Sequence, residues 1–237
     1  IAGEVKFRKK LTREQFRLFI AQQPACIVVF EACGSANYWA REVEKLGHEP
    51  KLIAPQYVRP FVKRQKNDAT DAEAIVIAAR QPEMRFVLPK TAEQQAKSVL
   101  FRNRERLVRQ RTELVSALRS ALYEYGHVFP IGLAHLKRMD ALVQGADCDL
   151  PSLIVTECRE LLAQIAETTE KITTKTKRLK ALADETDTAR RLQTMPGVGP
   201  LTALAVEAFA PQMGQFRCGR DFAAWLGLVP QIGRAHV

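Results

Sequence analysis

The order of apolar and polar positions predicts an α/β arrangement in the first 90 residues. Apolar runs at 26–30 and 51–54 have the length of buried strands, and the segment 37–46 between them has a helical period. Strand, helix and strand at this spacing imply parallel pairing through a right-handed crossover. Alternating apolar and charged residues at 5–9 also predict an edge strand.

Two further helices are expected in this region. The segment 11–20 has a helical period, and Thr12 is its expected N-cap. The segment 68–80 is predicted to be a helix that turns Ala72, Ile75 and Ala79 inward. Helices between and after the strands would complete an α/β domain at about residue 90.

Two long amphipathic helices are predicted next. Residues 92–125 contain no Gly or Pro, and Leu100, Leu107 and Leu114 are spaced seven apart. After a break at 126–151 that is rich in Gly, Pro and Asp, apolar residues again recur every seven positions from 158 to 179. This pattern predicts an antiparallel helical hairpin or a dimerising coiled coil. A plain helical bundle without a partner is the alternative.

The third region contains a glycine-rich turn between two helical segments. Gly197 and Gly199 separate these segments, as in a helix-hairpin-helix element, in which backbone amides at a helix N-terminus bind a DNA phosphate. The alternative is an ordinary turn between helices, with Pro200 at the first helical position.

Three carboxylates suggest the chemistry. Glu31 ends the first buried run, and Asp68 and Asp71 are three apart near the start of the helix at 68–80, so they share one helical face. Alone, each acid has an ordinary structural explanation, Asp68 as an N-cap and Asp71 as a first-turn acid. Together they predict an RNase H-like catalytic site for phosphodiester cleavage, with Mg²⁺ or Mn²⁺ held by hard oxygen ligands.

Charge favours nucleic acid as the partner. The formal net charge is +10 and the pI is about 9.6, and clustered Lys and Arg bind nucleic acid by displacing counterions. Lys63, Arg64 and Lys66 precede the two aspartates and are predicted to contact phosphate. The arginines of 102–111 are spread around several helical faces, which favours a solvated surface.

Other aspects of the composition exclude several classes of protein. The five cysteines are odd in number and far apart, without a Cys-x-x-Cys pair, which argues against a disulfide framework or a zinc site. No apolar run approaches the length of about 20 residues that a membrane span needs, and the first residues do not resemble a signal peptide. We therefore expect a cytoplasmic protein that does not associate with a membrane.

Four motifs resemble one known family over nearly the whole chain. They are Phe30-Glu-Ala-Cys-Gly-Ser35, the block 55–74, Met195-Pro-Gly-Val-Gly-Pro200 and the block 222–230. In order and spacing they are similar to the DEDD transposases of insertion sequences, the family numbered one-ten with its eleven-eleven subgroup, which includes the pilin-gene invertases.

The resemblance implies a three-part organisation. It implies an RNase H-like (RuvC-like) DEDD domain at 1–90, coiled-coil helices at 91–185 that mediate homo-oligomer assembly, and a small, truncated α-helical transposase domain at 186–231. It also implies DNA as substrate, a structured guide RNA as partner, and metal-dependent strand cleavage and transfer.

The family's catalytic residues carry over only in part. Glu31 matches the second acid of the family, and Asp68 and Asp71 match the third and fourth. The first acid belongs to a strand expected before Ile1, and the family serine is expected shortly after Pro230, where no serine of this chain matches.

This incomplete match predicts an inactive fragment. Residues 232–237 resemble the translation of a sequencing adapter and are expected to be foreign to the protein. Two other functions remain open. One is a RuvC-like structure-specific nuclease that uses the same acids without a serine, and the other is a non-enzymatic DNA-binding and assembly fragment.

Overall fold

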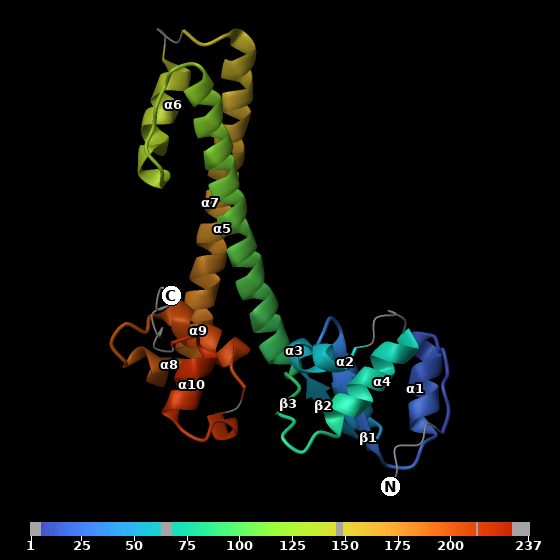
Figure 1. The fold of residues 1–237 in the computed structure, drawn as a ribbon. Coiled ribbons are helices and arrows are strands. Elements are labelled where there is room, and N and C mark those ends of the chain that lie inside the picture. Colours follow the sequence, from blue (N-terminus) through green and yellow to red (C-terminus); the bar gives the residue numbers. More distant parts are fainter. Residues whose placement is uncertain (1–5, 63–67, 146–148, 212, 229–237) are drawn as a thin grey trace, which may run out of the picture. The chain divides into compact units, whose positions relative to one another are not determined.

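The computed structural model describes residues 6–62, 68–145, 149–211 and 213–228 (Figure 1). The chain divides into two compact units. One comprises residues 1–93 and 210–237, and the other comprises residues 94–209. Helices predominate in both, and a small mixed sheet lies in the first unit. Over the described ranges, no helix combines the length and the apolar character that crossing a bilayer requires.

The sheet of the first unit has the order β1-β2-β3. Strands β1 (Ile27–Glu31) and β2 (Glu49–Ile53) pair in parallel, with Phe30 opposite Leu52 and Glu31 opposite Ile53. Helix α2 (Ala36–Lys45) connects them, and the short strand β3 (Phe86–Val87) pairs antiparallel with β2. The predicted strand–helix–strand unit with parallel pairing is therefore confirmed.

Helices cover both faces of this sheet. The neighbouring residues Leu52 and Ile53 of β2 point to opposite faces. Leu52 packs with Ala36 and Ala40 of α2. Ile53 packs in a separate cluster with Ala74 and Ala78 of α4 (Asp68–Ala79). Small side chains on both helices bring their backbones close to the sheet.

The inward face of α4 differs from the predicted one. Ala74 and Ala78 are fully buried, Ile75 and Ala79 are partly buried, and Ala72 is exposed. Apolar residues occupy almost every side of this helix after its first turn, so periodicity alone does not select the buried face.

Helix α1 (Arg13–Ala21) begins where the sequence predicts. Thr12 is its N-cap, and the capping box is complete: the Gln15 amide donates to Thr12 Oγ1 at 3.2 Å, and the Thr12 amide donates to Gln15 Oε1 at 2.9 Å. Two short turns of helix, α3 (Pro55–Val58) and η1 (Arg59–Phe61), follow β2.

The predicted edge strand at 5–9 is wrong over residues 6–9, which form no strand. The Phe7 ring instead packs edge-on against Phe19 of α1, with 5.4 Å between the ring centroids, and Lys9 Nζ lies 4.6 Å from the same Phe19 ring. Phe7 and Lys9 of this alternating segment therefore pack on helix α1 instead of joining the sheet.

The C-terminal part of the first unit is short and aromatic. It contains η3 (Met213–Gln215) and α10 (Gly219–Trp225). The rings of Phe222 and Trp225 stack, and Phe216 meets both at steep angles.

The second unit is built on two long helices that run side by side in opposite directions (Figure 1). Helix α5 (Ala92–Glu124) and helix α7 (Ser152–Glu185) share a core to which Leu118, Leu122 and Ile165 contribute. Arg104 Nε of α5 also donates a hydrogen bond to Thr176 Oγ1 of α7 at 3.3 Å. Within one chain, the two long helices thus cover each other's apolar faces.

The break predicted at 126–151 contains a helix that was not expected. After η2 (Leu133–His135), helix α6 (Leu136–Gln144) buries Met139 and Val143 in the core of the two long helices. Its apolar positions have a helical period, but the Gly, Pro and Asp residues around them mask so short a segment.

Two more helices pack at the end of α7. Helices α8 (Asp187–Gln193) and α9 (Pro200–Phe209) form one core with α7, in which Ala183, Ala189 and Leu204 are fully buried.

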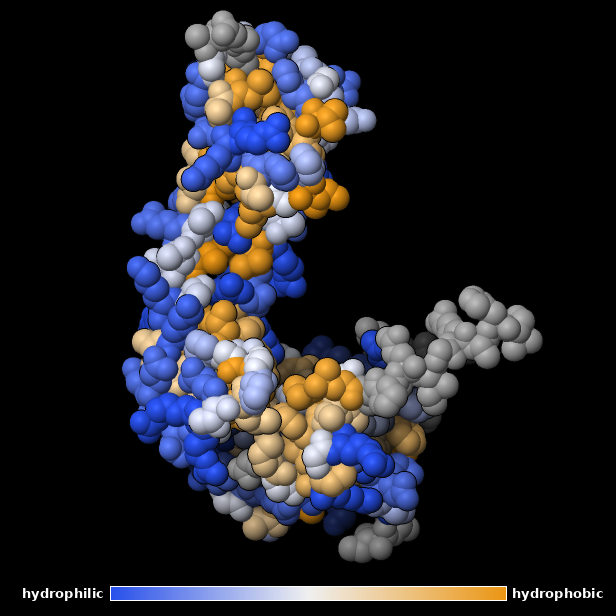
Figure 2. Space-filling model, turned by 90° about the vertical axis from the view of Figure 1, so that its left-hand side faces the viewer, coloured by the Kyte–Doolittle hydropathy of each residue, from blue (hydrophilic) through white to orange (hydrophobic). Residues whose placement is uncertain are grey.

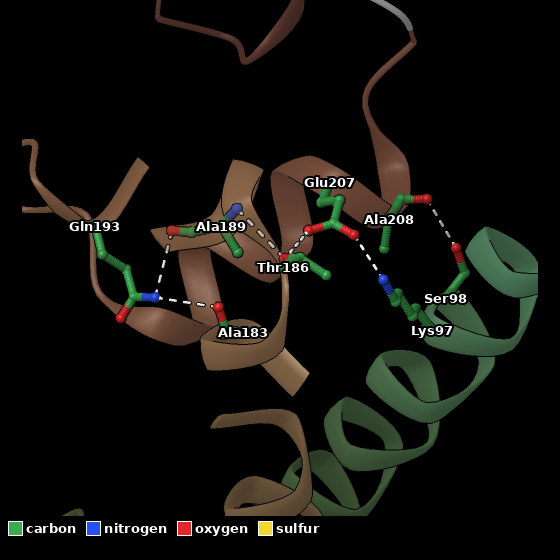
Figure 3. Close-up of polar contacts among 8 residues, drawn as sticks. All are labelled: Lys97, Ser98, Ala183, Thr186, Ala189, Gln193, Glu207 and Ala208. Atoms are coloured by element: carbon green, nitrogen blue, oxygen red, sulfur yellow. Dashed lines mark hydrogen bonds and ion pairs between the residues drawn. The ribbon is translucent and has the colours of Figure 1, made fainter. Parts of the chain in front are cut away.

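A group of polar residues, which we call the polar clamp, ties α8 and α9 to the start of α5 (Figure 3). Lys97 Nζ lies 2.6 Å from Glu207 Oε1, and the Thr186 hydroxyl donates to Glu207 Oε2 at 2.6 Å. Ser98 Oγ donates to the Ala208 carbonyl at 2.9 Å. Because Thr186 is also the N-cap of α8, the polar clamp fixes the orientation of both helices.

Candidate metal centre and nucleic-acid interface

Glu31 occupies the carboxyl end of the parallel strand pair. It is the last residue of β1, it is half-buried, and it lies opposite Ile53. The chain turns sharply after it, because the Cys33 amide donates to the Glu31 carbonyl at 2.8 Å. Ser35, with φ of 65°, is left-handed immediately before α2. A left-handed serine is strained, and its residue type gives no sequence signal of this strain.

Asp68 and Asp71 lie in the first turn of α4. Asp68 is exposed and is the first residue of the helix rather than the residue before it, whereas Asp71 is half-buried. Asp71 precedes the buried Ala74 by one turn, and α4 packs against β1 and β2. All three predicted acids thus belong to secondary-structure elements that contact one another.

The contacts of these acids are few. In the part of the chain that the structure describes, no hydrogen bond or ion pair involves the carboxylate of Glu31, Asp68 or Asp71. The neighbouring Glu73 of α4 does have such a contact, because its Oε2 lies 3.8 Å from Arg8 Nη2.

The three acids do not form a closed ligand set. Among residues 6–62, 68–145, 149–211 and 213–228, no three His, Cys, Asp or Glu side chains gather closely enough to hold a metal ion. The chemistry of the predicted donors fits Mg²⁺ or Mn²⁺, since all are hard carboxylate oxygens. Their number and grouping do not, so the three-acid metal site stays a prediction.

The predicted phosphate contacts fall into two groups. Lys63, Arg64 and Lys66 lie outside the described residues. Gly197 and Gly199 are both exposed in the turn between α8 and α9, and a Cβ added at either would meet no atom within 4 Å. This open surface leaves room for a ligand.

The turn itself is partly explained by backbone geometry. Gly197 has φ of 82°, which favours glycine whatever the function. Gly199 has no positive φ, and its carbonyl accepts the Ala203 amide at 2.9 Å, so that α9 begins at Pro200. The ordinary αα turn therefore accounts for Gly197 and Pro200 but leaves Gly199 without a steric reason.

Comparisons with known proteins agree with this architecture. Residues 3–127 match the DEDD transposase domain of the IS110 type, described as "Transposase", and cover more than half of the chain. Residues 189–234 match the family described as "Transposase IS116/IS110/IS902 family". The two matches define the protein as a transposase of an insertion sequence.

Individual relatives carry the same description. The chain is 43% identical over 226 residues to a Pseudomonas aeruginosa protein named "Probable family 20 transposase", covering 94% of this chain and 67% of that one. It is 39% identical over 229 residues to the "Transposase for insertion sequence element IS1328" of Yersinia enterocolitica, covering 97% and 68%. The chain belongs to the IS116/IS110/IS902 family of transposases.

The chain is shorter than these relatives. It covers 63% of the "Transposase for insertion sequence element IS1111A" of Coxiella burnetii, at 37% identity, and 58% of a Sinorhizobium fredii relative, at 45% identity.

Proposed function

We propose that this chain is the part of a DNA transposase that carries an RNase H-like (RuvC-like) strand-cleaving site. Glu31, Asp68 and Asp71 are the catalytic acids in this proposal. The reaction is metal-dependent cleavage and transfer of DNA strands at the ends of an insertion sequence. The chain alone is expected to be inactive, because the family's first acid and its serine have no match in it.

One observation carries this proposal. Glu31 ends a strand that pairs in parallel with its neighbour, and the helix bearing Asp68 and Asp71 packs on the same sheet. In open α/β sheets, sites form at the carboxyl ends of strands. An acid at this edge, with two more in the first turn of a packed helix, supplies part of the carboxylate set that an RNase H-like site requires.

The protein groups have distinct roles in the proposal. Glu31, Asp68 and Asp71 would hold Mg²⁺ or Mn²⁺, and the bound metal would neutralise charge on the phosphodiester. Asp68 and Asp71 lie at the start of α4, where the helix dipole is positive and acidic side chains are favourable. The left-handed Ser35 lies between the turn that follows Glu31 and the start of α2.

Nucleic acid and further copies of the chain are the proposed partners. Lys63, Arg64 and Lys66 would contact DNA phosphates, and the amides near Gly197 and Gly199 would bind one phosphate at the start of α9. By family resemblance a structured guide RNA also binds, and the long helices α5 and α7 mediate assembly of a homo-oligomer.

Metal binding by this chain tests the site directly. Titration with Mn²⁺, followed by electron paramagnetic resonance of the free ion, should show binding that weakens at least about tenfold in Asp68→Asn, Asp71→Asn and Glu31→Gln, since each substitution removes a charged ligand. Glu83→Gln is the matched control, because Glu83 is exposed and lies beyond α4. Equal Mn²⁺ affinity in all variants would show that these three acids do not bind the metal.

A completed protein tests the reaction. The segments that the relatives have beyond this chain are added, and cleavage of DNA that carries the ends of the element is measured. Asp68→Ala should abolish metal-dependent cleavage and leave DNA affinity unchanged, because phosphate contacts dominate affinity. Cleavage retained in Asp68→Ala would contradict the proposed mechanism.

A non-enzymatic DNA-binding and assembly protein is the second candidate. The absence of a grouped three-ligand set within the described residues favours it. It predicts salt-sensitive DNA binding that is indifferent to Asp68→Ala combined with Asp71→Ala, and no cleavage even in the completed protein. A structure-specific nuclease would instead cut branched DNA once the first acid is restored.

A further inference from the structure

Helix α7 has a second row of regularly spaced residues beside its buried face. The row recurs at alternating spacings of three and four, as the seam of a coiled coil does, and every member is exposed. We call it the α7 seam. It consists of Thr156, Arg159, Ala163, Ala166, Glu170 and Thr173.

The α7 seam borders a groove. Five of its six residues line a groove of about 770 Å³ between α6 and α7, whose other wall includes Leu136 and Gln144 of α6. Apolar atoms of Leu162 and Ile165 also line it. Figure 2, which shows the side of the helical hairpin on which α6 lies, displays apolar surface between hydrophilic side chains along the helices. A helix of matching shape could therefore lie along α7.

The residues of the α7 seam are arranged symmetrically. Ala163 and Ala166 are equidistant from a point between residues 164 and 165, and so are Arg159 and Glu170. Thr156 and Thr173 form the third such pair. A two-fold axis through this point places alanine beside alanine of the partner subunit and threonine beside threonine. It places the positive charge of Arg159 beside the negative charge of Glu170 of the partner subunit. Such self-complementarity is what an isologous contact requires.

We propose that the α7 seam is the contact between two copies of this chain, with the two α7 helices antiparallel. Alanines at the centre allow the helix axes to approach to about 8 Å, the lower end of the usual range. Arg159 then faces Glu170 of the partner subunit on both sides of the axis.

Charge also selects the orientation. In a parallel, in-register pairing, Arg159 would face Arg159 of the partner subunit, and Glu170 would face the partner's Glu170. Like charges across a seam are unfavourable, so the parallel arrangement is disfavoured. At about 1.5 Å per residue, the seam from Thr156 to Thr173 is about 26 Å long.

The polar side chains of the α7 seam can enter this contact without breaking interactions within their own chain. In the ranges that the structure describes, neither Arg159 nor Glu170 has an ion pair within its own chain. The hydroxyls of Thr156 and Thr173 donate to the carbonyls of Ser152 and Thr169 at 3.0 and 2.9 Å. Burying these threonines therefore leaves no hydroxyl donor unpaired.

This inference rests on the proposed assembly through the long helices and specifies its face. Sedimentation equilibrium of the wild-type chain, without metal or DNA, should show a dimer at micromolar concentrations. Arg159→Glu and Glu170→Arg should each weaken dimerisation at least tenfold, because each places like charges together. The double variant carrying both substitutions should recover most of the wild-type affinity, because it restores opposite charges in the antiparallel pair.

Glu157→Arg is the matched control for Glu170→Arg. Glu157 is exposed on α7 but lies outside the α7 seam, so this variant should dimerise like the wild type. Circular dichroism checks that all variants keep their helices. A dimer that is unaffected by Arg159→Glu and Glu170→Arg would overturn the seam while leaving assembly itself intact. A wild-type chain that stays monomeric would overturn both, and neither result depends on the metal site.

Discussion

The helices that cover the sheet and the two long helices of the helical unit differ in the side chains that they mainly bury. In the α/β unit, alanines make up most of the buried helix surface against the sheet, with Ala40 and Ala78 fully buried. In the helical unit, large aliphatic residues such as Leu118, Leu122 and Leu179 are fully buried. Each large side chain removes more apolar area from water than an alanine does. Each buried side chain of the long-helix core thus contributes more to stability, whereas the small alanine side chains let α2 and α4 lie close to the sheet.

The ion pairs of the two units also differ in how far their side chains are buried. In the helical unit, Lys97 and Glu207 have side chains that are only 8% and 17% exposed. In the α/β unit, Glu42 is similarly covered at 15% exposed, but its partner Lys45, 2.8 Å away, is 72% exposed. Removing a charge should therefore matter much more in the polar clamp than on the surface of α2.

The largest effect is expected from the core of the two long helices. Leu118→Ala should lower the free energy of unfolding by about 3 kcal/mol, because it removes buried methyl groups and leaves a cavity among well-packed neighbours. Urea unfolding followed by circular dichroism measures this loss. Leu153→Ala is the matched control, because Leu153 is 68% exposed on α7, and it should change the free energy little. Similar losses in both variants would mean that the described core does not determine stability.

The helical unit was also the easier one to predict from the sequence. Its seven-residue repeat fixes which face is buried, and the repeat positions Cys158, Ile165 and Leu179 are all fully or nearly fully buried. Helix α6 was missed because its nine residues give too short a pattern within a segment rich in Gly, Pro and Asp. The polar clamp was missed because residues far apart in sequence, such as Lys97 and Glu207, carry no local signal of their pairing.

The secondary-structure elements of the α/β unit could largely be predicted from the sequence, but the geometry of its candidate metal site could not. The existence of β1 and β2 and their parallel pairing followed from the apolar runs, although β2 begins two residues earlier than predicted, and Thr12 followed from capping chemistry. The inward face of α4 did not follow, because its alanines and β-branched residues lie on all sides. The positions of Glu31, Asp68 and Asp71 relative to one another depend on that packing. Residue types therefore indicated the chemistry of the site, whereas its geometry depends on tertiary contacts.

A smaller effect is expected from the polar clamp. Glu207→Ala should lower the free energy of unfolding by about 2 kcal/mol, because it removes the negative charge next to the buried Lys97 ammonium. Combining it with Lys97→Met should recover part of this loss, because the buried charge is then absent as well. Thermal or urea unfolding of both single variants and the double variant gives the coupling energy. Strictly additive losses would show that the two side chains do not interact energetically.

The smallest effect is expected at Glu42, where it should depend on pH. The hydrogen bond from Lys45 holds the pKa of the Glu42 carboxyl below its ordinary value, with help from the charges of Arg17 and Arg41. The ionised carboxylate therefore stabilises the folded state at pH values above the ordinary glutamate pKa, and this contribution is lost as the pH falls through the lowered value. Glu42→Gln should be slightly less stable than the wild type at neutral pH, and the difference should vanish in acid. Unfolding measured across this pH range checks the prediction, with Glu44→Gln as control, because Glu44 is exposed on another side of α2. A difference between wild type and Glu42→Gln that persists unchanged in acid would show that the amide acts through packing rather than charge.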